Sequence, residues 1–310
     1  MSALGTLGET FSALDGRLVA VALAFHLANF GFRSLAWRNV LRAAYPDRPV
    51  PLLGVAGAYA AGVALNAFTP ARGGDLLKVA LVRARVRGSS VPTIASTMGV
   101  VTLFDLVVGA AVIAVLAGLG LLPALPGLQA LPAVPALATD QLALALPATL
   151  GLGALVFVLA RRFRPRLVTA WENVKAGAAI LGTPRRYLTE VAPIQLSAWA
   201  CRVGAAFFLL AAFGLPATLV TALIVVMVGG LSTVVPTPGG VGTQQVMLAY
   251  LLHATASTAT VVSFSLGMQA AVTTLNAFLG AAAVMLMFRT LRPGSAIRSH
   301  IRAARAETSG

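Results

Sequence analysis

The chain has 310 residues, of which 58% are hydrophobic and only 10% are charged, and its mean hydropathy is +0.88. A soluble domain carries about 25% charged residues, so most of this surface must face lipid, which indicates a polytopic membrane protein. The formal net charge of +14 would suit nucleic acid, but the sequence has no basic soluble domain or aromatic–basic motif, and arginine enrichment on the cytoplasmic side produces the same imbalance. We therefore exclude nucleic acid as a partner.

The apolar residues are grouped into segments long enough to cross a bilayer, and we expect one all-α membrane domain over residues 1–310. Residues 1–17 form a tail that lacks the features of a cleaved signal. In chain order, full spans are predicted at residues 18–35, 91–119, 142–160, 191–213 and 257–288. Two further apolar segments, 51–88 and 217–253, are each broken near the centre by proline and glycine. Hydropathy counting alone would give about six to eight spans.

The placement of lysine and arginine predicts the topology. Arg33, Arg38, Arg42 and Arg48 follow the first span, and further basic residues lie in the ranges 72–87, 161–186 and 289–310. The loop 120–141 and the stretches near 214–217 and 254–257 have none. We therefore expect a multi-pass protein of a bacterial cytoplasmic (inner) membrane, with an external N-terminus and a basic cytoplasmic tail at 289–310.

The same rule constrains the two broken segments. If residues 51–69 crossed the membrane, five basic residues between 72 and 87 would become external. We therefore predict that 51–88 is a re-entrant hairpin from the cytoplasm, and that 217–253, whose flanks are uncharged, is one from outside.

Two hairpins entering from opposite faces predict an inverted repeat, with units at 18–119 and 187–288 joined by the crossing at 142–160. The sequence PARGGD at 70–75 aligns with PGGVGT at 238–243. After each hairpin, a polar residue, Asp105 or Asn276, stands four residues before a glycine within a span.

Each break has a physical cost that a binding site would explain. Backbone groups left unpaired in hydrocarbon are costly, so breaks occur inside protein or beside a water-filled cavity. Transporters use paired breaks to build a substrate site near the midplane. In the second break, beside Pro238, three glycines would let the backbone approach a ligand: Gly239, Gly240 and Gly242. The helix that follows would offer N–H groups to a phosphate. The alternative is a packing kink, but two matched breaks favour a site.

Charged residues mark the first break and two of the spans. Arg72, Asp75 and Lys78 follow one another at helical spacing around Gly73 and Gly74. They form either a salt-bridge cluster on a solvated face or an arginine–lysine pair that grips a lipid phosphate. In the spans, Asp105 is a functional candidate because an ionisable group at that depth is costly, and Arg202 is its complementary cation.

Further polar residues could complete the lining of a site, namely Asn29, Asn66, Asn276, Thr243, Gln244 and Gln245. Hydrogen bonding between helices is the alternative for each of them. His26 and His253 have no ligand partner at metal-binding spacing, so we predict no metal. The sequence contains no nucleotide-binding or catalytic motif, and we predict no cofactor.

Three stretches resemble the lysylphosphatidylglycerol synthase transmembrane-region family, also called flippase-like proteins. They are FRSLAWRNVLRA, LNAFTPARGGDLLKVALVRAR and VVPTPGGVGTQQVMLAYLL. The resemblance covers residues 18–290 and implies a domain that binds or translocates lipid, with site residues Arg72, Asp75, Lys78, Asp105, Pro238, Gly239, Gly240 and Gly242. The family often has an arginine at the position of Thr102 and a glutamate at that of Gln245, so a charge-coupled mechanism is in doubt here.

The resemblance does not predict the synthase reaction, because that chemistry requires a large soluble domain. We expect a protein that moves, or holds for movement, an anionic or polar-headed lipid, either phospholipid or isoprenoid-linked. The alternatives are a membrane-embedded enzyme that uses Asp105 as an acid or base, and a non-catalytic partner of an envelope-lipid enzyme. A homo-oligomer is left open.

Overall fold

The computed structural model describes residues 14–69, 72–121, 164–233, 237, 240–253 and 255–290. Within these ranges the chain is helical and has no strand, which confirms the all-α prediction. The helices are α2 (Gly16–Ala44), α3 (Leu52–Asn66), α4 (Gly74–Arg85), α5 (Val91–Gly118), α7 (Arg164–Gly177), the 3-10 helix η2 (Ala179–Gly182), α8 (Pro184–Glu190), α9 (Ala192–Ala212), α10 (Leu219–Ser232), α11 (Thr243–Leu251) and α12 (Thr258–Thr290).

Four stretches of the described chain are long and apolar enough to cross a membrane: Gly16–Ala44, Val91–Gly118, Pro184–Ala212 and Thr258–Met287. A crossing needs about 20 residues at 1.5 Å each. These stretches match four of the five predicted spans, and the chain is a polytopic membrane protein. The fifth predicted span, 142–160, lies outside the described residues.

Side chains at three helix starts explain where those helices begin. The Asp15 carboxylate accepts hydrogen bonds from the backbone N–H groups of the first turn of α2. Ser90 accepts from Thr93 at the start of α5, and Thr218 forms a capping box with Thr221 at the start of α10. Each cap satisfies donors that the helix itself leaves unpaired.

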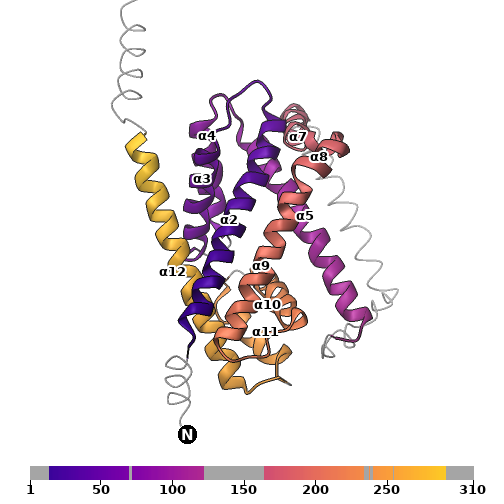
Figure 1. The fold of residues 1–310 in the computed structure, drawn as a ribbon. Helices are drawn as coiled ribbons and strands as arrows, with labels where there is room; N and C mark the ends of the chain where they lie inside the picture. The colour runs from indigo at the N-terminus through magenta and orange to yellow at the C-terminus, as the bar shows by residue number, and fades with distance from the viewer. Residues whose placement is uncertain are drawn as a thin grey trace, which may run out of the picture.

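The two broken segments each form a pair of short helices, α3 with α4 and α10 with α11. The pairs lie toward opposite ends of the bundle, with α3 and α4 high in Figure 1 and α10 and α11 low. Within each pair the two helices contact one another, and neither is long enough to be a candidate span. This arrangement is what two re-entrant hairpins from opposite faces would give, and re-entry remains a prediction.

The long helices pack across the proposed repeat units. α2 lies along α9, α3 lies along α12, and α10 contacts α5. Two apolar cores result, one built mainly by α2, α3, α4 and the start of α5, the other mainly by α9, α10, α11 and α12 with Ala22 of α2 and Leu116 of α5. Along α2 the cores are separated by the stretch between Ala22 and Ala36, so the polar residues of that stretch lie between them.

The described arginine-rich segments gather at one end of the bundle. Figure 1 places α4, α7 and α8 together at the upper end. Arg48, after α2, donates to the backbone oxygen of Arg87, after α4, at 2.8 Å. Asn39 of α2 donates to the backbone oxygen of Glu190 at 2.7 Å. The segments predicted to be cytoplasmic therefore lie at the same end of the bundle.

Candidate functional site

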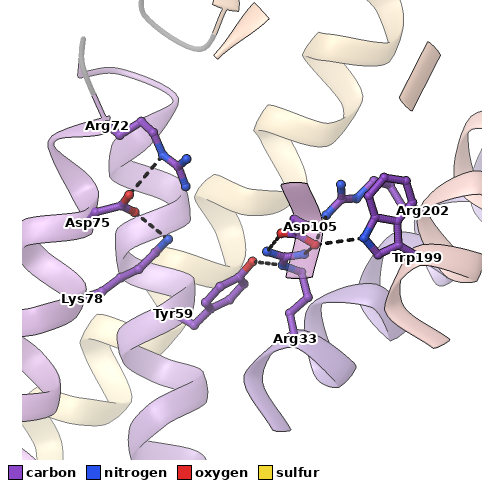
Figure 2. Close-up of polar contacts among 8 residues, drawn as sticks. All are labelled: Arg33, Tyr59, Arg72, Asp75, Lys78, Asp105, Trp199 and Arg202. Carbon is purple, nitrogen blue, oxygen red and sulfur yellow. Dashed lines mark hydrogen bonds and ion pairs between the residues drawn. The ribbon is translucent and has the colours of Figure 1, made fainter. Parts of the chain in front are cut away.

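Asp105 lies midway along α5, and both of its carboxylate oxygens accept hydrogen bonds (Figure 2). Arg33 of α2 donates to them from Nη1 at 3.0 Å and from Nη2 at 2.6 Å, which is a bidentate ion pair. Trp199 of α9 donates from Nε1 to Oδ1 at 2.9 Å. The side chains of Arg33 and Asp105 are only 14% and 20% exposed. Three helices therefore meet at one carboxylate, through hydrogen bonds that gain strength as water is excluded.

The position of Arg33 corrects the sequence-based assignment of this residue to the boundary after the first span. That assignment ended the span at residue 35, whereas α2 continues to Ala44. Arg33 therefore lies inside the candidate span and is paired within the bundle. The positive-inside rule counts arginines near span ends and carries no information about which of them turns inward.

Arg202, a predicted site residue on α9, is the second cation beside Asp105. Its Nη2 lies 4.0 Å from Oδ1, which is ion-pair range but too long for a hydrogen bond. Its guanidinium lies 4.9 Å from the centre of the Trp199 ring, a cation–π contact. The side chain is 30% exposed. Among the hydrogen bonds between described residues none uses this guanidinium, so its donors are available to a ligand.

Tyr59 of α3 joins this group to the first break. Its hydroxyl accepts a hydrogen bond from Arg33 Nε at 2.8 Å, and its ring centre lies 4.8 Å from Lys78 Nζ. Figure 2 shows Tyr59 between the two charged groups, with Asp75 on one side and Asp105 on the other. The two clusters are therefore neighbours, linked by one aromatic side chain.

Asp75, in the first turn of α4, is the centre of the second cluster. Lys78 Nζ donates to its Oδ1 at 2.8 Å, and Arg72 Nε lies 3.1 Å from its Oδ2. Asn66, the last residue of α3, donates to the same carboxylate at 3.1 Å and accepts from the backbone N–H of Gly74 at 2.7 Å. Asn66 thereby connects the end of one short helix to the start of the next.

The two cations of this second cluster differ in exposure. Lys78 is only 4% exposed, whereas the Arg72 side chain is 51% exposed. Arg72 also precedes α4 rather than sharing a face of it, and its φ of 58° is uncommon for a residue with a side chain. The cluster is therefore not a wholly solvated salt-bridge face, because one of its cations is buried inside the protein.

The glycines of the first break have a packing role. A Cβ on Gly74 would overlap the backbone oxygen of Gly62, and a Cβ on Gly62 would overlap the side chain of Lys78. Gly73 precedes the helix with an ordinary helical φ of −55°. The absence of side chains at Gly62 and Gly74 thus lets α3 and α4 approach closely. It also leaves room for the Lys78 side chain of α4 to lie against α3.

In the second break, Gly240 and Gly242 have φ values of 75° and 86°, which favour glycine. α11 begins at Thr243, and the Gln245 side chain accepts from the backbone N–H of Gly242 at 2.7 Å. One helix-terminal donor is therefore already satisfied within the protein. Pro238 and Gly239 lie outside the described residues.

Uncharged polar pairs continue from this break along α12. Gln245 donates to Gln269 of α12 at 2.7 Å, and His26 of α2 lies 3.0 Å from the side-chain oxygen of Asn276, also on α12. Gln244 is buried, at 8% exposure. Asn29, one turn before Arg33, is buried, and its side-chain oxygen has no hydrogen-bond partner among the described residues.

Four residues of this network were not identified as functional from the sequence: Arg33, Tyr59, Trp199 and Gln269. An aromatic residue in an apolar run is ordinarily core, and a glutamine in a long span gives no sign of its partner. Only the packing of α2, α3, α5, α9 and α12 reveals these contacts.

An all-helical bundle with four apolar spans among the described residues defines the class as a polytopic membrane protein. The model of the lysylphosphatidylglycerol synthase TM region matches residues 2–280. The chain belongs to this family, as its motifs predicted, and the family indicates a membrane protein related to lipid handling. The match concerns the membrane region of the family alone. Neither the curated proteins nor the solved structures give a match.

Proposed function

We propose that the protein binds the phosphate of a membrane lipid headgroup at the two linked clusters and moves that lipid between leaflets. The observation that carries this proposal is a charge imbalance across these two linked clusters. Arg33, Arg72, Lys78 and Arg202 supply four cations, whereas Asp75 and Asp105 supply two carboxylates. Excess charge inside a membrane protein is costly and calls for a partner of opposite sign. A lipid phosphate is the anion that the bilayer itself provides.

Arg202 and Arg72 are the cations best placed to take that phosphate. Arg33 and Lys78 already donate to carboxylates at 3.0 Å or less. Within the described chain Arg202 makes no such hydrogen bond, and the contact of Arg72 with Asp75 at 3.1 Å is through Nε, on a side chain that is 51% exposed. Guanidinium groups bind phosphate oxygens in pairs, with defined geometry.

The arrangement of the broken helices supports movement rather than static binding. Transporters build their sites from broken helices in corresponding halves, and rocking of one half against the other exposes the site alternately. Here the two broken pairs lie toward opposite ends, with the Arg33–Asp105 pair between the two apolar cores. In the topology that we propose, the arginine-rich end faces the cytoplasm and the N-terminus is external.

The enzyme alternative is weaker because its acid or base is already engaged. Asp105 accepts from Arg33 with both oxygens and from Trp199 with one of them. A carboxylate with these donors is a poor proton acceptor. In the described chain no second unpaired carboxylate lies beside it, as shown by the ion pairs of Asp75. We therefore propose binding and transport rather than chemistry on the lipid.

The proposal predicts that phosphatidylglycerol retention in lipid nanodiscs depends on Arg202. Arg202→Gln should weaken binding by about tenfold to a hundredfold, because a charge-assisted hydrogen bond contributes about 1.5–3 kcal/mol. Arg202→Lys should lose less, since it keeps the charge but not the paired donors. The readout is the bound lipid, measured by native mass spectrometry.

Arg186→Gln is the matched control, because Arg186 forms an exposed ion pair with Glu190 at the end of the bundle. It should bind lipid as the wild type does. Equal retention by Arg202→Gln and by the control would contradict the proposed phosphate contact.

A further inference from the structure

The two clusters can bind an anionic group, but they have no free carboxylate for a cationic one. This limits which chemical groups the rest of the lipid headgroup can carry. Asp105 is occupied by Arg33 and Trp199. Asp75 is occupied by Lys78, Asn66 and Arg72. An ammonium group that entered this space would find no free carboxylate among the described residues and would lie near cations instead.

The other described acidic residues lie at helix ends or outside the spans rather than in the interior. Asp15 caps α2, Asp47 lies between α2 and α3, and Glu172 is in α7. Glu190 ends α8, where Arg186 holds it at 3.0 Å. None of them reaches either charge cluster through an ion pair.

Toward the second break the lining is polar but uncharged. Gln245 and Gln269 pair at 2.7 Å, and His26 pairs with Asn276 at 3.0 Å. Among the described residues, the buried side-chain oxygen of Asn29 has no hydrogen-bond partner, and neither has the buried hydroxyl of Ser265, one turn before Gln269. Buried polar groups without partners are rare and costly, and a hydroxyl group is the kind of partner that both of them lack.

We propose that the site selects lipids whose phosphate is the only charged group of the headgroup and whose remainder is a neutral, hydroxyl-bearing alcohol. Headgroups with an ammonium group, including the lysylated lipid in the family's name, are disfavoured. This inference rests on the proposed function and adds a charge requirement to it. The excess cations bind the phosphate, and the side-chain amides and hydroxyls bind the neutral alcohol.

The test uses the full chain in nanodiscs of phosphatidylcholine that contain equal small fractions of phosphatidylglycerol and lysylphosphatidylglycerol. Native mass spectrometry then measures the ratio of the two lipids bound. We expect the wild type to retain about ten times more phosphatidylglycerol than lysylphosphatidylglycerol. The ammonium groups of the lysylated lipid would be repelled by the cations of the site, and like charges repel strongly where the dielectric constant is low. Gln245→Glu, which adds a carboxylate at nearly constant shape, should narrow that preference, whereas Arg186→Gln, at the exposed end of the bundle, should leave it unchanged.

Three outcomes would overturn the inference. Equal retention of both lipids would do so while leaving phosphate binding intact. Retention of neither above the phosphatidylcholine background would remove the proposed function as well. Displacement of the bound lipid by inorganic phosphate would assign the site to a free anion instead.

Discussion

At the scale of single residues, the central feature is one carboxylate that several donors share. Asp105 looks like an isolated intramembrane charge in the sequence, and the structure gives it Arg33, Trp199 and Arg202 as neighbours. That Asp105 needs a partner could be predicted, because an unpaired charge at that depth is costly. Which arginine supplies it could not, because Arg33 is separated from Asp105 by 72 residues and resembles a boundary arginine.

Mutations of Arg33 and Asp105 can separate the energy of their interaction from the contribution of each residue alone. Asp105→Asn leaves Arg33 buried without its counter-ion and should lower the free energy of unfolding by about 3–5 kcal/mol. Arg33→Gln together with Asp105→Asn removes both charges and should recover part of that loss. The measurement is a double-mutant cycle on thermal unfolding in detergent. Additive effects of the two single changes would mean that the pair is not energetically coupled.

At the scale of helices, the sequence predicts the long spans well. It predicts where the two broken segments lie, but not how their short helices pack. Apolar length predicted α5 and α12 almost to the residue, while α2 runs well past the predicted end, with Arg33 paired inside the bundle and Arg42 in its last turn. Proline and glycine predicted both breaks. The corresponding glycines of the proposed repeat differ in packing, however: a Cβ on Gly280 would overlap Ala64, whereas one on Gly109 would meet nothing closer than 3.9 Å.

This difference gives a matched set of glycine variants. Gly62→Ala and Gly74→Ala add a methyl group against backbone or a buried lysine and should destabilise the protein by about 1–3 kcal/mol. Gly109→Ala has room and, in a helix interior, should be neutral or stabilising by up to about 1 kcal/mol. Melting temperatures in detergent would test this. If Gly109→Ala lost as much stability as Gly74→Ala, the close approach of α3 and α4 would not be the reason that Gly74 is needed.

At the scale of the whole molecule, the chain combines an apolar exterior with a cationic interior. Exposed side chains such as Leu106, Phe278 and Met285 suit lipid contact, while four cations and two carboxylates form the two linked clusters, in which only the Arg72 side chain is more than half exposed. Composition predicted the exterior. The interior balance could not be read from composition, because the net charge of +14 includes the arginines at the bundle end as well. Assigning each cation to the interior or the surface requires the fold.

The central claim, that this interior carries a lipid phosphate between leaflets, is tested most directly by transport in proteoliposomes. Fluorescent phosphatidylglycerol is placed in both leaflets, and a membrane-impermeant reductant bleaches the outer one. We predict that wild-type protein exposes the inner-leaflet lipid to bleaching, that Arg202→Gln and Arg72→Gln are strongly impaired, and that Arg186→Gln is not. Bleaching that stops at the outer leaflet with folded wild-type protein, or equal activity in all three variants, would contradict the account.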